Sequence, residues 1–139
     1  MKVEVLSLCD FAQADPAGKL TIVGSFDRIH AAEEPITRSV FAIAARLRFE
    51  IDEEGTKSVA LSLVDSDGGR VMPGINAKFP VKVPQGESTA SVNFVMLIPK
   101  LSFPKFGDYQ LDLSIDSKIE AIVPLYVRQR PAASQQGFA

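Results

Sequence analysis

Apolar and polar residues alternate along much of this chain, and a period of two predicts β-strands. The pattern is clearest over residues 41–51 and 109–115. In the first stretch the apolar side chains recur at every second position: Phe41, Ile43, Ala45, Leu47, Phe49 and Ile51. A helix would scatter these side chains around its whole circumference. Each stretch is therefore predicted to be a half-buried strand.

Five further stretches have the same alternation, over residues 3–8, 20–26, 59–63, 90–98 and 119–127. Turn-forming residues separate them, at 14–18, 52–55 and 65–69. Seven strands at a spacing of about 8 to 12 residues are typical of a β-sandwich or barrel. We expect hairpins between 3–8 and 20–26 and between 41–51 and 59–63. Residues 28–39 are expected to form a long connection between two sheets.

Three local features refine this prediction. The apolar phase slips between Val5 and Leu6, which indicates a bulge in the first strand. Pro80 and its neighbouring prolines favour a short edge piece over residues 78–83. Tyr109 follows the Gly107–Asp108 turn at the start of a strand, as in the tyrosine corner of Greek-key sandwiches, where the hydroxyl bonds to upstream backbone.

These features together predict an all-β, immunoglobulin-like Greek-key β-sandwich of seven to eight strands. The sequence contains no helical stretch and no internal repeat. One domain over residues 1–128 and a mobile C-terminal tail over residues 129–139 are expected, because the tail is small, polar and interrupted by proline.

The run CDFAQADPAGKLTIVGSFDRI, the VDSDG turn and the later FPKFGDYQLDLSIDS resemble an uncharacterised bacterial family of single-domain β-sandwich proteins. The resemblance covers almost the whole chain. Its signatures are structural: turn glycines, an aspartate after a strand and a corner tyrosine. It implies no activity and no functional residues.

Charge and cysteine content narrow the functional classes. Fifteen Lys and Arg against seventeen Asp and Glu give a net charge of -2, which does not favour nucleic acid or an anionic membrane as partner. Cys9 is the sole cysteine, so it is expected to be a buried apolar filler. The N-terminal apolar run is shorter than the roughly 7 to 15 residues of a signal peptide and the roughly 20 of a membrane span. A cytoplasmic protein is expected.

Candidate chemistry is sparse. His30 is the single imidazole, and no serine or cysteine lies in a nucleophile-elbow context, so we predict no enzyme activity and no cofactor. Calcium is the best chemical alternative, because Asp65 and Asp67 offer hard oxygen ligands before Gly68. The match to an EF-hand loop then fails, and a backbone turn is the preferred interpretation. A loop-end site that also uses Asp52, for calcium or a small ligand and possibly enzymatic, stays open.

The outward side of the last strand is unusually apolar. If the strand over residues 119–127 faces the core with Ile119, then Ile122 and Tyr126 lie on the opposite side. Pro124 cannot donate to a ladder and indicates an edge or a bulge. Either the N-terminal strand covers this side, or a partner protein or second copy does, so Ile122 and Tyr126 are the candidate partner-binding residues. The predicted function is a noncatalytic binding or structural module.

Overall fold

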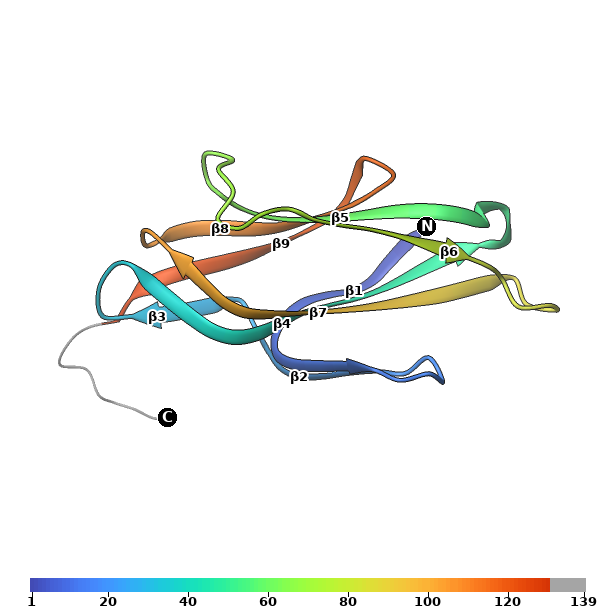
Figure 1. Ribbon diagram of the computed structural model, residues 1–139, viewed down its shortest axis with the longest axis horizontal. Coiled ribbons are helices and arrows are strands. Elements are labelled where there is room, and N and C mark those ends of the chain that lie inside the picture. Colours follow the sequence, from blue (N-terminus) through green and yellow to red (C-terminus); the bar gives the residue numbers. More distant parts are fainter. Residues whose placement is uncertain (131–139) are drawn as a thin grey trace.

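The computed structural model describes residues 1–130, which form nine strands in two sheets (Figure 1). Sheet A has the order β2-β1-β4-β7, with β1 (Lys2–Ala14), β2 (Leu20–Phe26), β4 (Ile36–Glu50) and β7 (Thr89–Phe103). Sheet B has the order β3-β9-β8-β5-β6, with β3 (Arg28–Ala31), β5 (Gly55–Asp65), β6 (Ile75–Val81), β8 (Gly107–Ile115) and β9 (Lys118–Gln129). A 3-10 turn, η1 (Ile51–Glu53), links β4 to β5.

The predicted all-β class is therefore confirmed, and six of the seven predicted stretches lie wholly in strands. The stretch 41–51 is the exception, because β4 ends at Glu50 and Ile51, which was predicted on the apolar face, is 58% exposed in η1. The register of β1 against β4 shifts between Val3 and Val5, so the first strand does contain a bulge, but at Glu4 and not between Val5 and Leu6 as predicted. The predicted edge piece corresponds to β6, which pairs only with β5. Residues 131–139 of the predicted tail lie outside the described residues, whereas Gln129 belongs to β9.

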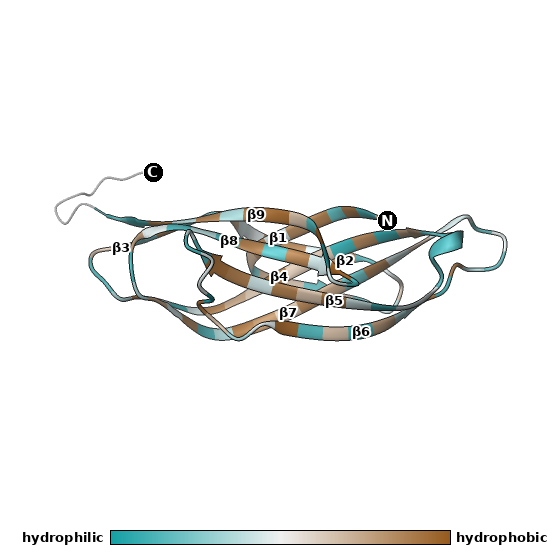
Figure 2. Ribbon diagram, turned by 90° about the horizontal axis from the view of Figure 1, so that it is seen from above, coloured by the Kyte–Doolittle hydropathy of each residue, from teal (hydrophilic) through white to brown (hydrophobic). Residues whose placement is uncertain are grey.

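One hydrophobic core fills the space between the two sheets. Its strongest contributors alternate along β4 and β8, and the alternation of apolar and polar residues along the strands can be followed in Figure 2. In β8 the four predicted inward residues are buried: Tyr109, Leu111, Leu113 and Ile115. Burial of apolar area is the main favourable term in folding. The period of two therefore identifies the buried face of β8 correctly.

The Tyr109 ring lies in this core, packed edge-on against Phe103 with their centroids 5.0 Å apart. Its hydroxyl donates a hydrogen bond of 2.7 Å to the backbone oxygen of Lys105. This is the predicted corner, and it ties the turn before β8 to the strand itself. Burial raises the pKa of the Tyr109 phenol, because the ionised form would lose its hydration.

The predicted hairpin between residues 41–51 and 59–63 is wrong. β4 pairs with β1 and β7 in sheet A, while β5 pairs with β6 and β8 in sheet B. The turn η1 between them therefore carries the chain from one sheet to the other. Alternation reports which side of a strand is buried, but it does not identify the neighbouring strand.

The expected long connection over residues 28–39 is also more ordered than predicted. It contains β3, which runs parallel to β9 from Arg28, and the first residues of β4. The chain crosses from sheet A to β3 in sheet B and back to β4, so the expected change of sheet does occur. A parallel pairing of four residues leaves no periodic signal long enough to detect.

Sheet A curls, so that the hairpin formed by β2 and the second half of β1 covers the outer face of β4 and β7. This hairpin lies beneath β4 and β7 in Figure 1. Ala42 and Ala44 are fully buried there beside Cys9, because their small side chains allow close approach. The hairpin turn is held by its Gly18 oxygen, which accepts hydrogen bonds of 3.1 Å each from Arg46 and Asn93. The chain thus builds a second, smaller apolar cluster outside the main core.

The predicted inward face of β9 is correct only in its second half. Leu125 and Val127 are buried, whereas Ile119 is 53% exposed. The β8–β9 register shifts between Leu113 and Ser114, near the β-hairpin turn. A bulge changes the phase of the side chains beyond it, so Ile119 no longer points to the core.

Candidate functional site

The outward side of β9 carries the two predicted partner-binding residues. Ile122 is 51% exposed, and Tyr126 is half-buried. The Tyr126 ring lies between two guanidinium groups, with Arg28 4.8 Å and Arg128 5.1 Å from its centroid. Cation–π contacts of this kind hold an aromatic ring in one orientation on an exposed sheet.

Arg128 is itself fixed by neighbouring groups of β8. Its Nη2 donates 2.6 Å to Asp108 Oδ1, and its Nη1 donates 3.0 Å to the Gly107 oxygen. Arg128 follows Tyr126 by two residues on the same strand, so the sequence places it beside the tyrosine, whereas Arg28 was not anticipated. Arg28 meets the ring because β3 and β9 pair in parallel with Arg28 opposite Tyr126, a register with no signal in the sequence.

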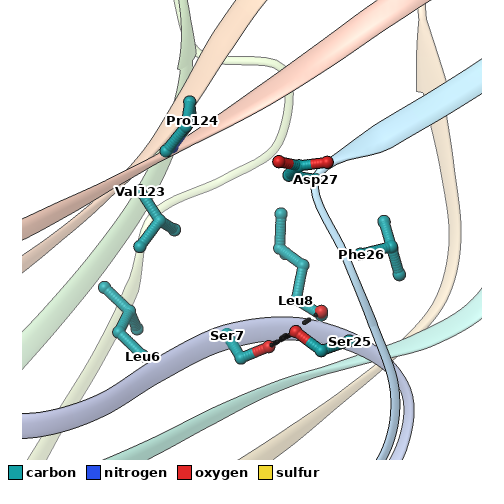
Figure 3. Close-up of a pocket in the computed structure, with 8 residues that line it drawn as sticks. All are labelled: Leu6, Ser7, Leu8, Ser25, Phe26, Asp27, Val123 and Pro124. Atoms are coloured by element: carbon teal, nitrogen blue, oxygen red, sulfur yellow. Dashed lines mark hydrogen bonds between the residues drawn. The ribbon is translucent and has the colours of Figure 1, made fainter.

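The N-terminal strand does not cover Ile122. β1 lies in sheet A, and its Leu6 faces Val123 of β9 across a groove between the sheets (Figure 3). The groove has a volume of about 370 Å³. Its lining residues come from β1, β2, β9 and the β2–β3 junction: Leu6, Ser7, Leu8, Ser25, Phe26, Asp27, Val123 and Pro124.

The groove lies where both sheets have strand edges without a partner. In β1 the pairing with β2 begins at Leu8, and in β9 the pairing with β3 begins at Tyr126. Residues 2–7 and 118–125 therefore border an open side among the described residues. The polar groups of the groove are partly paired, since the hydroxyls of Ser7 and Ser25 lie 2.6 Å apart.

The candidate catalytic groups do not come together. His30 is exposed on β3. Cys9 is fully buried, with its Sγ 3.7 Å from the Ala42 oxygen, and burial raises the pKa of its thiol. A buried, protonated thiol is a poor nucleophile, so Cys9 has the packing role that was expected.

The carboxylate of Asp65 is hydrogen-bonded to the backbone of its own turn. Asp65 Oδ1 accepts hydrogen bonds from the amides of Asp67 and Gly69, at 2.9 and 2.8 Å. Asp52 lies before β5 and Asp65 at its end, so they occupy opposite ends of an 11-residue strand. Within residues 1–130 no three His, Cys, Asp or Glu side chains are grouped to hold a metal ion.

A charged cluster on sheet A was not anticipated. The Glu4 carboxylate accepts hydrogen bonds of 3.0 Å from Arg46 and 2.6 Å from Arg48. The bond from Arg48, with help from Arg46, lowers the pKa of Glu4. These residues belong to β1 and β4, and the cluster joins the two strands at the bulge, where Glu4 itself is the extra residue.

Two packed sheets, a corner tyrosine and an exposed outer face of β9 thus define an all-β domain. Residues 4–128 match the model of DUF6941, a family of unknown function, and the chain belongs to this family. This agrees with the resemblance noted in the sequence. None of the curated proteins compared with the chain matches it.

Two solved structures are similar to the chain. The first is the alkylpurine DNA glycosylase AlkC of Pseudomonas fluorescens, bound to DNA containing an abasic site analogue, with a TM-score of 0.50 and 12% identity over 91% of this chain and 30% of that one. The second is a provisionally assigned β-galactosidase of Bacteroides fragilis, with a TM-score of 0.44 and 14% identity over 67% of this chain and 15% of that one. The chain spans less than a third of either protein, and the first likeness concerns the fold alone.

No helix among residues 1–130 is both long and apolar enough to cross a membrane.

Proposed function

We propose that this chain is a noncatalytic binding module that contacts a partner protein through the outer face of β9. The observation that carries the proposal is the exposed Ile122 beside Tyr126, with the tyrosine held between Arg28 and Arg128. Tyrosine and arginine are over-represented among the residues that contribute most to protein–protein binding. A ring that is already held in place loses little conformational entropy on binding.

The module is proposed to be an immunoglobulin-like Greek-key sandwich that works in the cytoplasm. Support for the topology comes from the strand order, the parallel β3–β9 pairing and the corner at Tyr109. The cytoplasmic location rests on the N-terminal apolar run, which is shorter than that of a signal peptide. Family membership assigns no activity, so the binding role rests on the β9 face.

Crosslinking in the producing cell tests the binding role. A photoreactive residue at position 122 is expected to capture one partner protein, and Tyr126→Ala is expected to reduce the yield. Val40, which is 60% exposed on β4, is the matched control position. Equal capture of the same protein from positions 122 and 40, or no capture from 122, would contradict the proposal. Melting temperatures of the variants must match the wild type.

The groove of Figure 3 favours a second candidate, a small apolar ligand. Its volume of about 370 Å³ falls within the range of about 300–1,000 Å³ typical of ligand sites. Leu6 and Val123 supply apolar walls, while Asp27 supplies a charged rim. A dye that fluoresces in apolar sites is expected to bind the wild type and to be excluded by Leu6→Trp. Equal fluorescence with both proteins would rule this candidate out.

A further inference from the structure

We infer that the chain forms a twofold dimer by antiparallel pairing of β7 with β7 of a second copy, which joins the two four-stranded sheets into one. This surface is separate from the β9 face, and β7 forms the opposite edge of its sheet from β2. The inference rests on three observations: an unprotected edge, an incomplete core beside it, and opposite charges at its two ends.

The four terminal strands of the two sheets differ in how they are protected. β3 has four residues and carries Arg28, and β6 carries Lys78 and Pro80. β2 is short and is interrupted by Gly24, whose φ of +67° bends the strand. Short strands, lysine, proline and bends are the usual devices against unwanted strand addition. Three of the four edges therefore have such a device along their length, whereas β7 has only Pro99 and Lys100, near its C-terminal end.

β7 lacks these protective features over most of its length. It contains fifteen residues, pairs only with β4, and no backbone group on its other edge is hydrogen-bonded within the described part of the chain. From residue 88 to residue 99 no side chain is charged, and Pro99 is the first residue that would interrupt a ladder. A long uncharged edge is a template for a further strand.

The core beside this edge is incomplete. Val92, Phe94 and Met96 pack against the core but are only partly buried. Their ladder partners on β4 are at most 1% exposed: Leu47, Ala45 and Ile43. A strand added to β7 would place a second row of inward side chains beside the first. The partly buried row of β7 would then be buried as the β4 row is.

Charge selects a second copy in antiparallel orientation. The uncharged segment is bounded by Glu87 and Lys100, both exposed and neither in an ion pair among residues 1–130. A twofold axis reverses the strand direction, and with the axis at Phe94 the residue opposite Glu87 of one copy is Leu101 of the other, one residue from Lys100, at both ends. Centred on Phe94, this register sets Val92 opposite Met96 of the second copy, apolar against apolar.

Sedimentation equilibrium with charge-swapped variants tests the inference. The wild type is expected to reach twice the 15.1 kDa chain mass as concentration rises. Glu87→Lys and Lys100→Glu are each expected to raise the dimer Kd about tenfold, since each replaces two attractive pairs with two repulsive ones. The Glu87→Lys/Lys100→Glu double variant is expected to restore the dimer Kd of the wild type. Lys118→Glu on β9, with the same net charge as Lys100→Glu, is expected to leave Kd unchanged.

Hydrogen exchange adds a measurement that does not depend on mass. The β7 amides that point away from β4 are expected to be protected at high protein concentration and to exchange rapidly after dilution below Kd. The inference is overturned by a wild type that stays at 15.1 kDa, by a double variant no tighter than the single ones, or by outward β7 amides whose exchange ignores concentration. None of these outcomes bears on crosslinking at position 122, so the two proposals fail independently.

Discussion

Removal of one oxygen atom, in Tyr109→Phe, tests the corner that begins β8. The phenylalanine ring keeps the edge-on contact with Phe103, so the change removes only the 2.7 Å hydrogen bond to the Lys105 oxygen. An orphaned acceptor costs about 1–3 kcal/mol. Lys105 is exposed, so water can partly replace the bond, and we expect about 1 kcal/mol, at the low end of this range.

Urea denaturation followed by circular dichroism measures this loss. With an m-value of about 2 kcal/mol/M, a loss of about 1 kcal/mol lowers the midpoint by about 0.5 M. The matched control is Tyr126→Phe, because the Tyr126 hydroxyl makes no hydrogen bond to the described residues, and its midpoint is expected to stay that of the wild type. An unchanged midpoint for Tyr109→Phe, or an equal drop for both variants, would refute the corner as a stabilising contact.

Three further predictions concern other parts of the molecule. The pKa of Tyr109 is raised in the folded state, so the folded chain holds the phenol proton more tightly than the unfolded chain. Stability is therefore expected to fall as pH rises above about 10. Urea midpoints that fall equally with pH in Tyr109→Phe would contradict this. Ala44→Leu overfills the cluster under the β1–β2 hairpin and is expected to cost about 1–3 kcal/mol by thermal denaturation, whereas exposed Val40→Leu is neutral. Millimolar calcium is expected to leave the melting temperature unchanged. A calcium ion bound at a hundred times its Kd would add about 2.7 kcal/mol to the free energy of unfolding, so a rise in melting temperature that Asp65→Ala with Asp67→Ala abolishes would establish a calcium site.

The sequence alone was enough to assign strands, faces and the corner. Alternation along β4 and β8 identified their buried sides, because a strand places successive side chains on opposite faces. Gly107 and Asp108 before Tyr109 indicated the corner, since that contact spans only four residues. The turn at Asp65–Gly69 was likewise predictable, because its hydrogen bonds are local.

Candidate site residues were only partly predictable. Ile122 and Tyr126 were found because apolar residues on an outward phase are visible in the sequence. The contact of Arg28 with Tyr126, and the groove between Leu6 and Val123, depend on which strands become neighbours. Ile119 was misplaced because a bulge of one residue reverses the phase without an obvious residue signature.

Strand pairing was decided by the tertiary structure. Alternation is a property of one strand and its solvent, whereas pairing is a competition among all strands for backbone partners and shared core volume. β4 takes β1 and β7 rather than the next strand in the chain, and the Ala42–Ala44 face is buried only because the N-terminal hairpin folds beneath it. For the same reason, the open edge of β7 cannot be seen in its residues: any strand with that pattern could lie at the centre of a sheet, and only the assembled fold leaves it at the end.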